Sequence, residues 1–269
     1  MTCYAWRGRE GEENLYEHLV ETYKVASQMW ELEALARKLS SLKSLGKEKV
    51  KEAVLAAALL HDVGKAASEY QNACARGECE RFPGHYLVST LYTYIVLKEG
   101  LGVYAPCKTE ELIAVLSGGK EAEEGVVVSL LILLPIALHH IHQVYAYQSL
   151  QYSRDEENAR RYHQVHSSCA QCLEDLASFI SERFEHLGGL GKVRELPQLI
   201  AGTDSAARES FIRALNLVRN LENAVKGIEP SSLSLAIEAA TGIVNLSDGY
   251  VAAKARSKRS QRDPHASRK

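Results

Sequence analysis

Apolar residues recur every three to four positions in several long stretches of the chain, which is the spacing typical of amphipathic α-helices. The first stretch follows Asn14, a residue that favours the start of a helix, and it places His18 at the edge of the apolar face. The second leads directly to His61, and Gly64 follows at a position where a helix can end. The pattern predicts helices over the ranges 14–40, 47–61, 65–75, 85–98, 109–116, 125–138, 154–187, 204–225 and 231–259.

Glycines and polar residues mark the connections between these predicted helices. The predicted connections are the polar segment 43–49, the loop 76–84, the pair Gly118–Gly119, and a linker at Gly188–Gly191. No stretch shows a convincing alternation of apolar and polar residues, which would predict a β-strand. The fold class expected from the pattern is therefore all-α.

The charge of the chain is unevenly distributed. Of its 269 residues 46% are hydrophobic, which is enough for one large domain or two small ones. The segment 254–269 contains seven lysines and arginines and one aspartate, a charge of +6, so the total of −2 leaves −8 for the remainder. Such a tail can contact nucleic acid, or it can be a solvated, disordered end. We expect one domain over 1–256 and a basic, disordered tail over 257–269.

The most apolar stretch, 125–138, is too short to span a bilayer and contains Pro135, so we expect it to form a buried core helix. The N-terminal residues 1–14 are polar and charged, unlike a secretory signal. These features predict a cytoplasmic protein without membrane contact. In the cytosol its six cysteines would usually be reduced, although intracellular proteins of hyperthermophiles form an exception.

A histidine and an aspartate, His61 and Asp62, stand together at the end of an apolar stretch. A carboxylate buried there must be paired or must coordinate a metal, because an isolated buried charge is strongly unfavourable. Neutral imidazole is the commonest metal ligand, and further histidines lie at the ends or edges of predicted helices. The additional candidates are His18, His85, His139 and His140, together with Asp248, which interrupts a late apolar stripe.

A single buried histidine is more often a hydrogen-bonded core residue than a ligand, and a His-Asp pair also occurs by chance. The order of the motifs is more specific: a histidine, His-Asp-Val-Gly-Lys at 61–65, Gly-His at 84–85, His-His at 139–140, and a late aspartate. This order resembles that of the HD-domain superfamily of metal-dependent phosphohydrolases. The doubled histidine is similar to that of the HD nuclease of type I CRISPR–Cas interference.

The resemblance implies an HD-domain-like helical bundle with two divalent metal ions in its core. It also implies endo- or exonucleolytic hydrolysis of phosphodiester bonds in single-stranded DNA. The implied ligands are His18, His61, Asp62 and Asp248 for the first metal, and Asp62, His85, His139 and His140 for the second. Asp62 would bridge the two ions, and histidine-rich ligands suit Mn, Fe, Co or Ni better than Mg.

Two of the residues have simpler interpretations. Lys65, which the resemblance places opposite the scissile phosphate as a catalytic charge, could instead be a surface lysine after a turn. Asp204 is an alternative to Asp248 as the late carboxylate, but it lies where a helix cap is expected.

The chain has no phosphate-binding loop of the P-loop type. The resemblance therefore implies the stand-alone nuclease subunit, which acts on single-stranded DNA beside a separate helicase subunit and an RNA-guided surveillance complex. Two alternatives stay open. One is a nucleotide or cyclic-nucleotide phosphohydrolase of the same superfamily, and the other is a non-catalytic helical adaptor that binds metal for stability.

A second group of metal-ligand residue types lies outside these motifs. His163, His166, Cys169 and Cys172 follow one another at intervals of three, and Cys74 and Cys79 lie elsewhere. On a regular helix the four positions drift around the axis, so all four cannot face one ion. Two of them could join Cys74 and Cys79 in a structural zinc site. Buried thiols or one disulfide are the alternatives.

Overall fold

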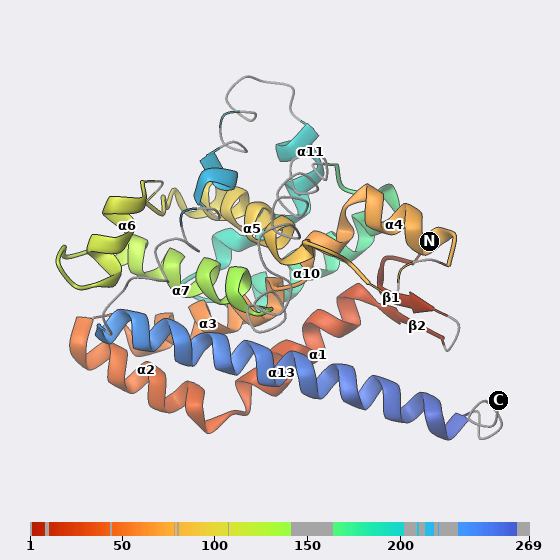
Figure 1. Ribbon diagram of the computed structural model, residues 1–269, viewed down its shortest axis with the longest axis horizontal. Coiled ribbons are helices and arrows are strands. Elements are labelled where there is room, and N and C mark those ends of the chain that lie inside the picture. Colours follow the sequence, from red (N-terminus) through yellow and green to blue (C-terminus); the bar gives the residue numbers. More distant parts are fainter. Residues whose placement is uncertain are drawn as a thin grey trace.

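A computed structural model shows a helical chain with one short hairpin near its N-terminus (Figure 1). The strands are β1 (Tyr4–Gly8) and β2 (Gly11–Asn14). The α-helices are α1 (Leu15–Ser27), α2 (Trp30–Lys43), α3 (Lys47–Leu60), α4 (Ser68–Ala75), α5 (His85–Leu101), α6 (Thr109–Leu116), α7 (Glu124–Leu138), α10 (Ala170–Arg183), α11 (Leu196–Ala201) and α13 (Ser232–Arg262). The 3-10 helices are η1 (Val63–Ala66), η3 (Ser167–Cys169) and η4 (Gly188–Glu195).

The structure describes residues 2–8, 11–43, 45–77, 79, 81–106, 108–140, 164–201, 209, 213–217, 220 and 231–262. Within them the all-α fold class is confirmed, and the hairpin is a small addition to it. No helix among these residues has the length and hydrophobicity needed to cross a membrane.

Helices α5 and α7 form the centre of the bundle. Every residue from Val127 to Leu138 of α7 is buried, as is every residue from His85 to Leu97 of α5. Helix α7 packs against α3, α5 and α13, and α13 also crosses α1 and α2 (Figure 1). The expected core helix over 125–138 is therefore confirmed, and it carries the doubled histidine at its C-terminal end.

The first predicted helix, 14–40, is wrong as a single element. Helix α1 ends at Ser27 and α2 begins at Trp30, and the amides of Gln28 and Met29 bond to carbonyls three residues earlier. Such bonds tighten and end a helix. The break lets α1 and α2 each pack a separate apolar stripe against α3 and α13, which a single straight helix could not do.

The expectation of no strands is also wrong. Strands β1 and β2 pair antiparallel, with Trp6 opposite Glu13. Strand β2 reads Gly-Glu-Glu-Asn and buries none of its side chains fully, so its sequence has no apolar alternation to detect. The buried amide of Gln71 holds the hairpin through hydrogen bonds to both backbone groups of Tyr4.

The glycine-rich linker predicted at Gly188–Gly191 is wrong as well, because these residues begin η4, which packs against α5 and α10. A Cβ atom at Gly189 would lie 2.3 Å from the carbonyl oxygen of Gly100. The glycine therefore permits close packing rather than a flexible connection.

Two other predicted helices differ from the structure. The helix expected over 154–187 corresponds to α10 from Ala170 onward, preceded by the 3-10 helix η3, and residues 141–163 lie outside the described residues. Most of the helix expected over 204–225 also lies outside them. Helix α13 extends to Arg262, into the segment expected to be a tail, and residues 263–269 are not described.

The structural zinc site is contradicted by the pairing of the cysteines. Cys74 forms a disulfide with Cys79, and Cys169 forms one with Cys3. Cys172 is a buried thiol, and His163 lies outside the described residues. Of the alternatives left open for these cysteines, the structure therefore shows two disulfides and one buried thiol. The Cys3–Cys169 disulfide joins the residue before β1 to the last residue of η3, which directly precedes α10.

Candidate metal centre

A tight turn after α3 places His61 and Asp62 in the core. The turn continues into η1, where the amide of Gly64 donates a hydrogen bond to Ser89 Oγ in α5 at 2.9 Å. A Cβ atom at Gly64 would lie 2.4 Å from the backbone nitrogen of Ser89. Glycine is therefore required for this close packing, which fixes the His-Asp pair beside His85 at the start of α5.

The two carboxylate oxygens of Asp62 face different sets of histidines. Its Oδ1 atom lies 2.9 Å from His85 Nε2 and 3.7 Å from His139 Nε2. Its Oδ2 atom lies 3.3 Å from His18 Nε2 and 3.4 Å from His61 Nε2. A single buried carboxylate thus stands between two groups of imidazoles.

The first group consists of His18, His61, Asp62 and Asp248, contributed by α1, the turn after α3, and α13. Asp248 Oδ1 lies 3.2 Å from His18 Nε2 and 3.6 Å from His61 Nε2. One ligand atom of each residue lies within 4.8 Å of the others. This spacing allows the four atoms to surround one metal ion.

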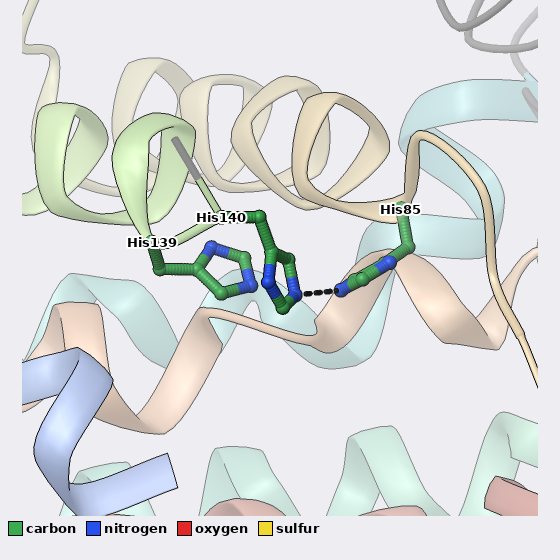
Figure 2. Close-up of side chains that lie close together, drawn as sticks. All are labelled: His85, His139 and His140. Atoms are coloured by element: carbon green, nitrogen blue, oxygen red, sulfur yellow. Dashed lines mark hydrogen bonds between the residues drawn. The ribbon is translucent and has the colours of Figure 1, made fainter. Parts of the chain in front are cut away.

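The second group consists of His85, His139 and His140, shown in Figure 2. His85 begins α5, and the other two follow the last turn of α7. The ring of His140 lies between those of His139 and His85, and its Nε2 atom is 3.0 Å from His85 Nε2 (Figure 2). Nitrogen atoms that converge in this way suit a shared cation.

The opposite edge of four of these rings is fixed by an oxygen atom. The Nδ1 atoms of His61, His85 and His139 bond to backbone carbonyls, at 2.9, 2.5 and 2.6 Å. The Nδ1 atom of His18 instead lies 3.2 Å from the carboxylate of Glu13. Such outer partners orient metal-binding histidines. Sequence reasoning missed Glu13, because it lies in a hairpin that the pattern did not predict.

Within the part of the chain that the structure describes, four buried polar atoms at the centre have no hydrogen-bond partner of acceptable geometry: His18 Nε2, His61 Nε2, His139 Nε2 and Asp62 Oδ1. Buried polar atoms are nearly always satisfied in native proteins, so such a concentration needs an explanation. Imidazole nitrogens and carboxylate oxygens are suitable ligands for divalent transition metals. The residues present therefore fit a metal centre.

Charges at the centre are strongly coupled. Burial alone would raise the pKa of Asp62, but the Lys65 ammonium and the rings of His61 and His85 hold it well below its usual range. Burial opposes the charged form of His61, yet the carboxylates of Asp62 and Asp248 outweigh it and raise the pKa of His61 to about 9.

The two ends of the centre differ in their electrostatics. The carboxylates of Asp248 and Asp62 outweigh burial at His18 and raise its pKa well above the usual value. At His140, burial and the neighbouring imidazoles lower the pKa to about 2, and burial also lowers the pKa of His139. The first group is thus a strongly negative environment, whereas at His139 and His140 burial favours the neutral imidazole.

Lys65, predicted to be a catalytic charge, lies beside the centre. Its Nζ atom is 2.6 Å from Asp62 Oδ2 and 5.0 Å from the centre of the Phe82 ring. The structure thus brings together all the predicted site residues, from His18 to Asp248. Asp204, the alternative late carboxylate, lies outside the described residues.

A groove of about 350 Å³ lies beside the first group, between the start of α1 and the C-terminal half of α13. Four glutamates line it, namely Glu12, Glu13, Glu17 and Glu21, together with His18 and Lys254 among other residues. This lining favours cations over phosphates.

Comparison with known proteins agrees with this geometry. Neither a search of curated proteins nor a search of solved structures found a match. A family model described as Cas3, HD domain, matches residues 6–207, which is more than half of the chain and includes every site residue except Asp248. The chain therefore belongs to the Cas3 HD-domain family, the metal-dependent HD-type nucleases of CRISPR systems.

Proposed function

We propose that the chain is a metal-dependent nuclease that hydrolyses phosphodiester bonds of single-stranded DNA in CRISPR interference. The observation that carries this proposal is the position of Asp62, whose two oxygens face two separate groups of ligand atoms. Two divalent ions about 4 Å apart are typical of enzymes that hydrolyse phosphodiesters, and a carboxylate with one oxygen toward each group could help to hold both.

The metal ligands follow from the two groups. His18, His61, Asp62 and Asp248 would hold one ion, and Asp62, His85, His139 and His140 the other. Mn, Fe, Co or Ni suits this nitrogen-rich set better than Mg. When bound, two such ions supply Lewis acidity toward a phosphodiester and lower the pKa of water.

The side chains around the ions determine where a phosphate can approach. The groove beside His18 is lined by glutamates, which repel a phosphodiester. His140 is only partly buried, and it lies on the other side of Asp62. We therefore place the scissile phosphate on the His140 side, away from the groove. The Lys65 ammonium, which contacts the Asp62 oxygen that faces His18 and His61, would offset part of the negative charge that develops on the phosphate.

Helix α13 supports a nucleic-acid substrate. The helix contributes Asp248 to the centre and continues to Arg262, and five of the nine residues from Lys254 to Arg262 are basic while none is acidic. At 1.5 Å per residue, this end lies roughly 20 Å along the helix axis from Asp248. A basic helix of this length can follow a DNA backbone beyond the site of cleavage.

The enzyme would act in the cytoplasm beside a separate helicase subunit and an RNA-guided surveillance complex, which supply unwound DNA. The experiment that tests the proposal is incubation with Mn²⁺ or Co²⁺ and circular single-stranded DNA, beside an Asp62→Ala control. Cutting by the wild type alone supports it. Hydrolysis of mononucleotides but not of DNA would favour a nucleotide phosphohydrolase, and turnover of neither substrate would favour a metal-stabilised adaptor.

A further inference from the structure

The group that holds the Nδ1 atom of His18 differs from the groups that hold Nδ1 of His61, His85 and His139. At His61, His85 and His139, Nδ1 is held by the backbone carbonyl of the residue three positions earlier in the chain. At His18, Nδ1 is held by the side-chain carboxylate of Glu13 in β2. The first group therefore has a negatively charged outer partner, and the second has neutral ones.

The position of each histidine in its helix explains this difference. His61 and His139 follow the last turns of α3 and α7, where carbonyls lack partners within the helix, and His85 stands at the start of α5. His18 is the fourth residue of α1, so the carbonyl three positions earlier already takes part in the bonding of the helix itself. The strand that leads into α1 supplies Glu13 instead.

The chemistry of this contact determines the state of the ring. A carboxylate accepts hydrogen bonds, so in the neutral ring that a metal ligand must be, the proton of His18 lies on Nδ1 and the lone pair of Nε2 faces Asp62 and Asp248. A charged acceptor also makes the ring a stronger ligand than a neutral carbonyl does.

We propose that Glu13 is a positioning residue that selectively strengthens metal binding by the first group, without touching the metal itself. The proposal rests on the metal ligands assigned under the proposed function. It identifies a residue of this chain that gives the two sites different affinities for metal. Loss of such an outer partner typically weakens metal binding about 10–100-fold.

The location of Glu13 makes it suitable for substitution. Its side chain lines the groove and is 18% exposed, so a glutamine there keeps its volume and remains in contact with water. Glu17 provides a matched control, because it lines the same groove with the same charge but has an exposed side chain. Comparing Glu13→Gln with Glu17→Gln separates the contact with His18 from the general charge of the groove.

The test is calorimetric titration of the full chain with Mn²⁺. We expect two binding events in the wild type. In Glu13→Gln the affinity of one site for Mn²⁺ should fall about 10–100-fold. In Glu17→Gln the affinities of both sites should stay within about twofold of the wild-type values. A His140→Ala background, in which only the first group is intact, identifies the affected site. Thermal unfolding without metal, expected to be similar in all variants, shows that each is folded.

Three outcomes would overturn the inference: Glu13→Gln binds both ions as the wild type does, it weakens both equally, or Glu17→Gln has the same effect. A wild type that binds no Mn²⁺ would overturn the proposed function as well. Failure of the two claims is therefore distinguishable, since metal affinity is measured in the absence of any substrate.

Discussion

Asp248 Oδ1 lies 3.2 Å from His18 Nε2, so the last helix of the bundle meets the first at the metal centre. These residues are 230 positions apart, and Asp248 lies beyond the residues that the family model matches. The first group is therefore complete only when α13 is packed across α1. Metal binding should couple the two ends of the chain.

Replacing Asp248 tests this coupling. Asp248→Asn removes one charged ligand from the first group and leaves the second group intact. We expect titration with Mn²⁺ to show one strong site in place of two. Asp175→Asn, on α10, where the carboxylate accepts a hydrogen bond from Gln171 of the same helix, is the control and should retain both sites. Two undiminished sites in Asp248→Asn would exclude Asp248 as a ligand.

The complementary substitution is His140→Ala. His140 belongs to the second group, and its partly buried ring faces His85 (Figure 2). We expect the second ion and the cutting of single-stranded DNA to be lost, and the first ion to be retained. His186→Ala, which removes an exposed imidazole, should change neither the binding of the two ions nor the cutting of single-stranded DNA. Full activity in His140→Ala would show that a single ion suffices.

Gly64 should be indispensable for the geometry of the centre. The Cβ atom added by Gly64→Ala would overlap with Ser89 N and with the carbonyl of His85. We expect a loss of about 1–3 kcal/mol in the free energy of unfolding by urea, as for other overpacked cores. Gly242→Ala is the control, because among the described residues no atom outside the adjacent backbone of α13 lies within 4 Å of its new atom, and it should stabilise α13 by up to about 1 kcal/mol. Equal stability of the two variants would contradict the packing argument.

Metal affinity should rise with pH. The pKa of His61 is raised to about 9 without metal, so an ion that binds at neutral pH must displace a proton. Apparent affinity for Mn²⁺ should increase by up to about tenfold per pH unit for each proton released, and should level off above about pH 9.

The stability of the metal-free chain should show the opposite trend. The pKa of His61 is higher in the folded chain than in the unfolded chain, so protonation of His61 stabilises the fold. This contribution to the free energy of unfolding is complete below about pH 6.5 and is lost as the pH rises through about 9.

For metal affinity, calorimetry in buffers of different ionisation enthalpy measures the protons released when Mn²⁺ binds. A pH-independent affinity between pH 6.5 and 9 would contradict the assigned charge state.

The two disulfides should differ in their effect on stability. Cys3 and Cys169 are 166 positions apart, whereas Cys74 and Cys79 are 5 apart. Closing the longer loop should contribute about 5 kcal/mol and the shorter about 2 kcal/mol, if constraint of the unfolded chain dominates. Urea unfolding of the two double alanine variants measures both values. Detection of six free thiols in the denatured wild type would show that neither disulfide forms.

The sequence predicted the helices best where apolar spacing was sustained, as over 47–61 and 109–116. It failed where the signal is short or absent. The four residues of β2 are mostly charged, and the break after Ser27 depends on how α1 and α2 pack against other helices. At Gly188–Gly191, glycine indicated flexibility, but the structure uses it for close contact with Gly100.

The candidate site was predictable in a different way. The pattern placed His61 and His139 at helix ends, but only the resemblance indicated that these ends meet. No local signal leads to Glu13 or Ser89, because their roles depend on contacts with residues that lie on other elements. Ligand residue types can therefore be found from sequence, whereas the partners that orient them require the fold.

The most direct test of the central claim is anomalous diffraction from crystals of the full chain grown with Mn²⁺. The account predicts two peaks about 4 Å apart, one on each side of Asp62, with His18, His61 and Asp248 around the first and His85, His139 and His140 around the second. No peak at this carboxylate, or a single peak bound to only one of its oxygens, would contradict the bridging role of Asp62.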